Sequence, residues 1–261
     1  MTTSIGIDWA TKPKGRGAVI LRSDDGNIAV TDIRDPLVVT DSEAVRLATE
    51  EPAAVVAVDI PFGWPAEFAS FVNAWSVVGQ DQPVPESLDF RFRATDKAVK
   101  DKKRCGKTPM PVSADKFALG ARLWAEIARE QGWAGRVDVD GSKAGSDPAP
   151  IIEVYPGASL RCFGLKSEGY KGDKDKAKSL RVALVDKLVG MFKVSFVGSF
   201  KPASLARTDN ELDAFVAALT GLAYLGKLPN WKVEMPSTEG EKSLAPKEGW
   251  IFFPVPITQG Q

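Results

Sequence analysis

Two aspartates end apolar runs in the first quarter of the chain. Asp8 follows Ser4-Ile5-Gly6-Ile7, and Asp59 follows Ala53-Ala54-Val55-Val56-Ala57-Val58. Runs rich in Val and Ile that stop near Gly or Pro are typical of buried strands. An ionised aspartate fits only near the end of such a strand, because burying an unpaired charge is costly. If the two strands are neighbours, the like charges require a cation, and a hard divalent metal with oxygen ligands meets that need.

The chain contains no histidine. This excludes Ser-His-Asp and Cys-His catalytic arrangements and most zinc sites. An enzyme built on this sequence must therefore use carboxylates, lysines, hydroxyls or a metal ion.

A third group of carboxylates opens a long predicted helix. Thr208 and Glu211 match a capping box, which predicts a helix that runs to about Leu225. Asp209 and Asp213, four residues apart, lie on one face of that helix beside its apolar stripe. The apolar residues of the stripe recur at helical spacing and are Leu212, Phe215, Val216, Leu219, Leu222 and Ala223.

Packing of this helix on the sheet would bring its aspartates toward Asp8 and Asp59. Such a carboxylate set fits one or two Mg²⁺ or Mn²⁺ ions, and a metal pair can activate water for phosphodiester hydrolysis. Each residue also has a simpler interpretation. Asp209 could complement the helix dipole, Asp213 could form a salt bridge, Asp8 could pair with a lysine, and Asp59 could form a turn.

Two further groups of residues are candidates for the site. Glu153 lies near the end of a predicted strand over 150–156, although it could also face solvent. The segment from Arg91 to Lys107 holds eight basic and two acidic residues, and could contact a phosphate backbone. Arg93, Arg91 and Lys107 are its candidate substrate contacts. The alternative for this segment is a solvated lysine-rich loop.

The remaining pattern predicts one α/β domain over residues 1–261. Strands near 4–10, 16–22 and 28–33, joined by short links, predict an antiparallel meander. A helix near 42–48 then leads to the strand of Asp59, which makes that pairing parallel. The less regular segment at about 62–131 is interpreted as a helical, cap-like insertion that ends in a helix. A further polar-faced helix is expected over 174–189.

Composition limits the partners and the compartment. The 34 basic and 34 acidic residues cancel, so no global field attracts nucleic acid or a membrane, and local charge matters more. Cys105 and Cys162 form no paired framework, which favours reduced thiols. Without an apolar run of membrane length or an N-terminal leader pattern, a cytoplasmic protein is expected.

The order of these motifs resembles domain of unknown function 429, a family of predicted nucleases with a ribonuclease H-like fold. The segments that carry the resemblance run in order along the chain and are Gly6–Ala10, Val58–Pro65, Arg93–Asp96, Glu153–Pro156, Asp209–Ala214 and Glu248–Ile251. The resemblance implies a mixed sheet, with three antiparallel strands followed by helix-linked parallel strands. It also implies an acidic site at Asp8, Asp59 and Asp213, with Asp209 as a further candidate.

The leading hypothesis is a metal-dependent phosphodiesterase, a nuclease, with Asp8, Asp59 and Asp213 as ligands of Mg²⁺ or Mn²⁺. Its partner is a nucleic acid, either DNA or RNA. Two alternatives stay open: an enzyme that acts on nucleotides or small phosphoesters in a lidded pocket, and a non-catalytic module that binds nucleic acid or protein.

Overall fold

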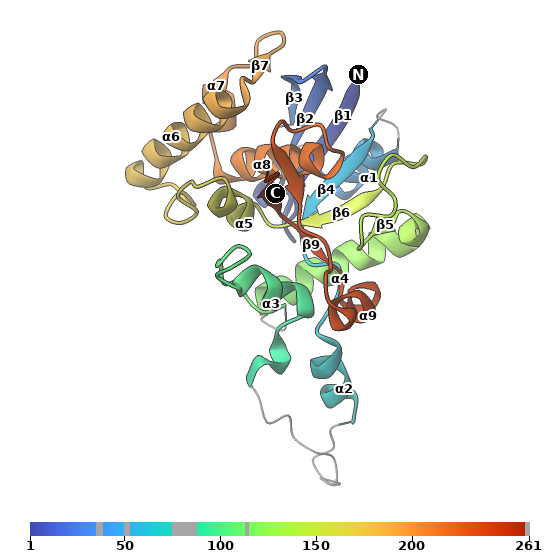
Figure 1. Cartoon of the computed structure of the whole chain (residues 1–261). Helices are drawn as coiled ribbons and strands as arrows, with labels where there is room; N and C mark the ends of the chain where they lie inside the picture. Colours follow the sequence, from blue (N-terminus) through green and yellow to red (C-terminus); the bar gives the residue numbers. More distant parts are fainter. Residues whose placement is uncertain (35–38, 50–52, 75–87, 113–114, 259–261) are drawn as a thin grey trace.

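The computed structural model describes residues 1–34, 39–49, 53–74, 88–112 and 115–258. Within these residues, eight strands form one mixed sheet in the order β5-β6-β4-β1-β2-β3-β7, with β9 also paired to β6 (Figure 1). The strands of this sheet are β1 (Thr2–Asp8), β2 (Gly17–Asp24), β3 (Asn27–Arg34), β4 (Val55–Asp59), β5 (Val137–Asp138), β6 (Ile151–Val154), β7 (Ser195–Phe196) and β9 (Ile251–Phe252). A separate two-stranded sheet pairs β8 (Trp231–Val233) with β10 (Pro254–Pro256).

Strands β1, β2 and β3 form an antiparallel meander, as expected from the sequence. The turn between β2 and β3 consists of Asp25 and Gly26, both at positive φ, which is the backbone that a two-residue Asp-Gly hairpin requires. β4 pairs parallel to β1, and β6 pairs parallel to β4. The mixed sheet implied by the ribonuclease H-like resemblance is therefore present.

Helices cover both faces of the sheet (Figure 1). They are α1 (Asp41–Thr49), α2 (Ala66–Ala74), α3 (Ala94–Lys100), α4 (Asp115–Glu130), α5 (Pro156–Cys162), α6 (Asp175–Phe192), α7 (Pro202–Leu205), α8 (Asp209–Tyr224) and α9 (Glu239–Glu248). Short 3₁₀ turns occupy Pro13–Gly15, Leu88–Arg91 and Trp133–Gly135. No helix of the described residues is both long and apolar enough to cross a membrane.

The two larger apolar cores of the described residues follow from the alternation of side chains along each strand. Val55 and Ala57 of β4 face the core that contains α8, whereas Val56 and Val58 face the core that contains α1 and part of α4. Successive residues of a strand point to opposite faces, so Asp59 at the end of β4 belongs to the α8 side.

α8 is the central helix of the fold. The sequence predicted one apolar stripe, but every residue from Glu211 to Tyr224 is buried. The sheet contacts one side of α8, and α5, α6, α7 and the small β8–β10 sheet contact other parts of it. A helix enclosed in this way needs apolar or small residues around its whole circumference.

The residues between the expected strand of Asp59 and Gln131 form α2, α3 and α4, together with a 3₁₀ turn. Figure 1 places α2 and α3 at the lower end of the molecule, beside α9 from the C-terminal part of the chain. Residues 75–87 and 113–114 of this expected cap lie outside the described residues.

α8 packs against β1 at backbone distance. A Cβ atom added to Gly6 would lie 2.0 Å from the carbonyl oxygen of Ala214 and 2.4 Å from the nitrogen of Ala218. One strand position earlier on this face, the Ser4 hydroxyl donates to the Ala218 carbonyl at 2.8 Å. A Cβ added to Gly221 would lie 2.3 Å from that same hydroxyl oxygen. The interface therefore accepts only the smallest residues.

We expect Gly6→Ala to lower the free energy of unfolding by about 3 kcal/mol or more, because a methyl group at this position overlaps the α8 backbone. Urea denaturation measures the change. Gly190→Ala is the matched control, since Gly190 is an exposed residue of α6 with open space around its α-carbon. That variant should gain about 1 kcal/mol of stability from helix propensity. Equal midpoints for wild type and Gly6→Ala would contradict the close contact.

Candidate metal centre

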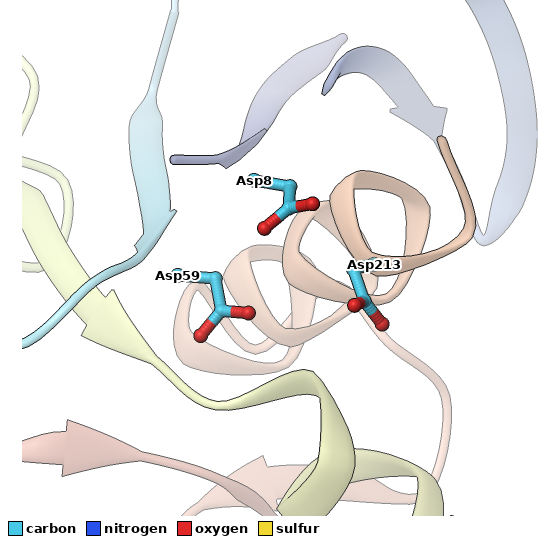
Figure 2. Close-up of side chains that lie close together, drawn as sticks. All are labelled: Asp8, Asp59 and Asp213. Atoms are coloured by element: carbon cyan, nitrogen blue, oxygen red, sulfur yellow. The ribbon is translucent and has the colours of Figure 1, made fainter. Parts of the chain in front are cut away.

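Three aspartates from three elements meet at one edge of the sheet. Asp8 is the last residue of β1, Asp59 is the last residue of β4, and the two are direct partners in the parallel ladder. Asp213 lies in α8, which covers the same face. Each carboxylate offers an oxygen, and these three oxygens lie within 4.8 Å of one another. Figure 2 shows the three side chains facing a common space.

The start of α8 determines where Asp213 lies. The Thr208 hydroxyl accepts a hydrogen bond from the Asn210 N–H at 3.2 Å, and Glu211 accepts one from the Thr208 N–H at 2.9 Å. This is the capping box that the sequence predicted. The capping box fixes the residue at which α8 begins. Asp213 lies in the second turn of the helix, and its carboxylate therefore lies beside the ends of β1 and β4.

The cluster brings like charges together with little compensation. Burial, and then the charges of Asp213 and Asp59, raise the pKa of Asp8 well above its usual value. Desolvation raises the pKa of Asp59 to about 7, although the charge of Lys171 opposes the rise. Within the described part of the chain, no hydrogen bond or ion pair reaches the carboxylate of Asp8 or Asp59.

Asp213 differs from the other two because protein groups hold it. The Tyr170 hydroxyl donates to its Oδ1 at 2.8 Å, and the Lys171 ammonium lies 2.8 Å from its Oδ2. Asp213, and more weakly Asp8 and Asp59, raise the pKa of Lys171 above its usual value. The loop between α5 and α6 thus supplies one positive charge to a site with three carboxylates.

The donor set fits a hard divalent cation. It consists of carboxylate oxygens alone, which Mg²⁺ and Mn²⁺ accept, and two of its members have no partner among the described residues. Two oxygens on one Mg²⁺ can be at most about 4.2 Å apart, so oxygens that lie within 4.8 Å of one another can reach one ion after a small inward shift. When the three carboxylates are ionised, a single lysine leaves the cluster net negative, which favours an additional cation.

Asp209 lies one helical turn before Asp213 and does not join the cluster. Its Oδ1 faces the backbone N–H of Gly172 at 3.5 Å, and its charge contributes only weakly to the raised pKa of Asp8. As a partly exposed residue of the first turn, it also complements the helix dipole. Its catalytic role stays a prediction.

Glu153 lies on the other face of the sheet. In the ladder between β4 and β6 it pairs with Val58, whose side chain points away from α8. Its carboxylate, 1% exposed, accepts from Arg93 Nη2 at 2.7 Å and Nη1 at 2.9 Å, and from the Phe62 N–H at 2.9 Å. The geometry therefore places Glu153 in a buried ion pair and not among the three aspartates.

Arg93 is buried as deeply as Glu153, at 1% exposure. Its guanidinium donates also to Asp96, through Nε at 3.2 Å and Nη2 at 3.1 Å, and to the Glu248 carbonyl at 3.0 Å. All five donors of the side chain are thus accepted by protein. In the structure, Arg93 joins α3, β6 and α9 through these hydrogen bonds. Its expected contact with a substrate phosphate stays a prediction.

Glu248, the last residue of α9, completes this junction. One of its carboxylate oxygens accepts from the N–H of Ala66 at 2.7 Å, and the other accepts from the N–H of Ala94 at 2.6 Å. These alanines are the first residues of α2 and α3, so one carboxylate satisfies the free N–H groups of two helix starts.

The other two predicted substrate contacts lie outside the carboxylate cluster. Arg91 is exposed, with its guanidinium carbon 5.3 Å from the centre of the Phe92 ring. The Lys107 ammonium contacts the Glu168 carboxylate at 2.9 Å and the Ser167 carbonyl at 3.4 Å. Lys107 thus connects the end of the basic segment to the loop that carries Lys171.

A cavity of about 430 Å³ opens beside Asp59. Its walls come from the ends of β4 and β6, the 167–171 loop, and the segment that contains α3 and α4. The lining residues are Asp59, Ile60, Pro61, Arg93, Asp96, Pro109, Met110, Phe117, Glu153, Val154, Tyr155, Gly157, Ser167, Glu168, Gly169, Tyr170, Lys171 and Ile251.

Sequence reasoning did not identify Tyr170 and Lys171. They lie in a polar loop between two helices, and their spacing to other residues carries no periodic signal. The only hint is chemical: three predicted carboxylates without a partner require a nearby cation. The walls of the cavity were also missed, because they come from segments separated by up to about 190 residues, from Asp59 to Ile251.

We expect Arg93→Met to lower the free energy of unfolding by about 3–5 kcal/mol, because it leaves Glu153 and Asp96 as buried charges without their cation. Urea denaturation at neutral pH measures the loss. Lys242→Met is the matched control, since Lys242 pairs with Glu239 at 3.0 Å on the exposed surface of α9. That control should change stability by less than about 1 kcal/mol. If Arg93→Met and Lys242→Met lose equal free energy of unfolding, the buried network around Arg93 does not stabilise the fold more than a surface ion pair does.

The raised pKa of Asp59 predicts a pH-dependent stability in chelator. Between about pH 4 and pH 7, the folded protein keeps a proton on Asp59 that the unfolded chain has released, so this group destabilises the fold increasingly as pH rises. Asp59→Asn removes that dependence. We expect the variant to gain stability relative to wild type across this window, and the gain to level off above pH 7. If the difference in stability between Asp59→Asn and wild type does not vary with pH, the pKa of Asp59 is not raised by burial.

Comparisons with known proteins place the chain in a family. No curated protein matches it. Among solved structures, it is similar to the Holliday junction resolvase Ydc2 of yeast mitochondria, with 9% sequence identity, a TM-score of 0.35, and coverage of 86% of this chain and 80% of that chain. The family described as "Protein of unknown function (DUF429)" matches residues 6–232, a range that includes Asp8, Asp59 and Asp213. The chain therefore belongs to the DUF429 family.

Proposed function

We propose that this protein is a metal-dependent phosphodiester hydrolase, a nuclease, with its active site at Asp8, Asp59 and Asp213. The observation that carries the proposal is the convergence of three carboxylates whose oxygens lie within 4.8 Å of one another. In the part of the chain that the structure describes, two of the three have no hydrogen-bond or ion-pair partner. Such an arrangement costs stability, and a bound cation is the simplest reason for it.

Asp8, Asp59 and Asp213 would hold one or two Mg²⁺ or Mn²⁺ ions. When bound, such ions lower the pKa of water and stabilise the charge on a leaving oxygen, chemistry that needs no histidine. Tyr170 and Lys171 fix the position of Asp213 through its two oxygens. Asp213 would thus be the ligand with a fixed position, while Asp8 and Asp59 are free to turn toward a cation.

The proposed substrate is a nucleic acid. Within the segment from Arg91 to Lys107, the exposed basic residues are Arg91, Lys97, Lys100, Lys102 and Lys103. Cations that remain in water can exchange counterions with a phosphate backbone, unlike the buried Arg93. The exposed part of this segment, rather than Arg93, would then hold the phosphates on either side of the cleaved bond.

A second candidate is an enzyme that acts on a nucleotide or another small phosphoester. The cavity beside Asp59 favours it, because a space of about 430 Å³ is in the range that holds a small molecule. The two candidates share the same carboxylates and differ in the length of the substrate that they accept.

The test is cleavage of labelled single-stranded, duplex and branched DNA, RNA and hybrid with Mg²⁺, Mn²⁺ or chelator. We expect Asp8→Asn, Asp59→Asn and Asp213→Asn each to lower the rate by about 100-fold or more, since even indirect support of a metal is worth 10–100-fold. Asp186→Asn, an exposed aspartate of α6, is the matched control and should retain the wild-type rate. Asp209→Asn should have a smaller effect than the three cluster variants.

Calorimetry with Mn²⁺ tests the same residues without turnover. Wild type should bind the ion, and each of the three cluster variants should bind it more weakly. Full metal-dependent cleavage by Asp8→Asn and Asp213→Asn would refute the proposed site. Absence of cleavage on every nucleic acid, with Mn²⁺ bound normally, would favour the small-phosphoester candidate.

A further inference from the structure

The cavity beside Asp59 has walls of two kinds. Asp59 and Lys171 belong to the carboxylate cluster and its counter-ion. The lining also includes the aromatic and apolar side chains of Phe117 of α4, Met110 and Tyr155, and the Tyr155 ring lies near enough to feel the charges of Asp59 and Lys171. Met110 is 57% exposed although it is a large apolar residue, and a ligand in the cavity would cover part of it. The cavity therefore continues the metal centre into an apolar space.

Apart from Asp59, the charged residues that line the cavity are already paired with protein groups. Within the described lining, Arg93 donates to Glu153 and Asp96, and Lys171 contacts Asp213. Glu168 accepts from Lys107. Among the described lining residues, no cation is free to hold an anion away from the metal centre. A phosphate is therefore favoured only at the carboxylate cluster when a metal ion is bound there, and the group that enters the apolar part must be neutral.

A nucleobase meets these requirements. It is neutral, planar and joined to a phosphate through one sugar, and it stacks on aromatic side chains such as Phe117 and Tyr155. A volume of about 430 Å³ admits one nucleoside but not a duplex, whose paired bases are also unavailable to side chains.

We propose that the cavity receives one unstacked nucleobase of the substrate, with the adjoining phosphate at Asp8, Asp59 and Asp213. The inference rests on the proposed function and narrows it to nucleoside phosphates with an unpaired base. The base could belong to a single-stranded end or loop, or to a free nucleotide, and the experiment below separates these sources.

The first arm uses a single-stranded oligonucleotide whose cleavage position has been mapped. It is synthesised again with a tetrahydrofuran abasic residue on one side or the other of the cleaved bond. We expect the abasic residue on one side to lower kcat/KM by about 10-fold or more, because stacking of that base is lost. Equal kcat/KM for the abasic and the normal strands on both sides would overturn the inference while leaving the nuclease intact.

The second arm compares variants of two residues on α4. Phe117→Ala removes a wall of the cavity, whereas Leu119→Ala removes an apolar side chain that is 54% exposed outside the cavity. The measured quantity is the ratio of kcat/KM for the normal strand to kcat/KM for the abasic strand. We expect Phe117→Ala to bring this ratio close to one, and Leu119→Ala to leave it at the wild-type value. Met110→Ala should also lower the preference for the normal strand. Because Met110 is exposed, this variant changes the wall of the cavity without disturbing packed residues.

The third arm does not depend on cleavage. Binding of a deoxynucleoside 5′-monophosphate and of deoxyribose 5-phosphate is measured by calorimetry with Mn²⁺. Tighter binding of the nucleotide, weakened by Phe117→Ala and Met110→Ala but not by Leu119→Ala, supports a base site. If no oligonucleotide is cleaved, that result retains the base site for free nucleotides and rejects the nuclease. Equal affinity for the two phosphates, without a base effect in cleavage, overturns the inference.

Discussion

The contact between α8 and β1 at Gly6 is the constraint on which the rest of the structure depends. Side chains usually separate the backbone of an α-helix from the sheet on which it packs. Here the backbone of α8 lies where a Cβ of Gly6 would be. This close approach allows a short aspartate side chain of the helix to reach the ends of two strands. It also explains why α8 is buried around its circumference and why small residues line both sides of the interface.

The metal centre shows how stability and function oppose each other in this fold. Three carboxylates at the end of the sheet weaken the metal-free protein, and the interactions around them limit that cost. Lys171 offsets one charge, and Tyr170 holds the oxygen that Lys171 does not contact. The buried network of Arg93, by contrast, is closed: each donor has an acceptor, and no ligand is needed. The two charged clusters lie close together, yet within the described part of the chain only Asp8 and Asp59 of the two clusters lack a hydrogen-bond or ion-pair partner.

The sequence was sufficient for the sheet, the principal helices and the position of the three aspartates, because each depends on local periodicity, on caps or on an apolar run that ends in a charge. Glu153 could not be placed, because the face on which it lies depends on the register between β6 and β4, a relation between distant segments. The partners of Arg93 were hidden for the same reason: two of its three acceptor residues lie 60 and 155 positions away. Lys171 belongs to a loop without periodicity. The cavity forms only when strand ends, helices and this loop from distant parts of the chain are assembled.

Glu248 makes the order of synthesis relevant to this fold. Its carboxylate holds the first N–H groups of α2 and α3, which leave the ribosome more than 150 residues before it. β9, which directly follows, adds the strand next to β6. The N-terminal meander is made of neighbours in the chain and can form early. The α2–α3 region, in contrast, gains its contacts with Glu248 only after the C-terminal tenth of the protein has been made. A nascent or truncated chain would therefore carry Asp8 and Asp59 before the α2–α3 region has these contacts.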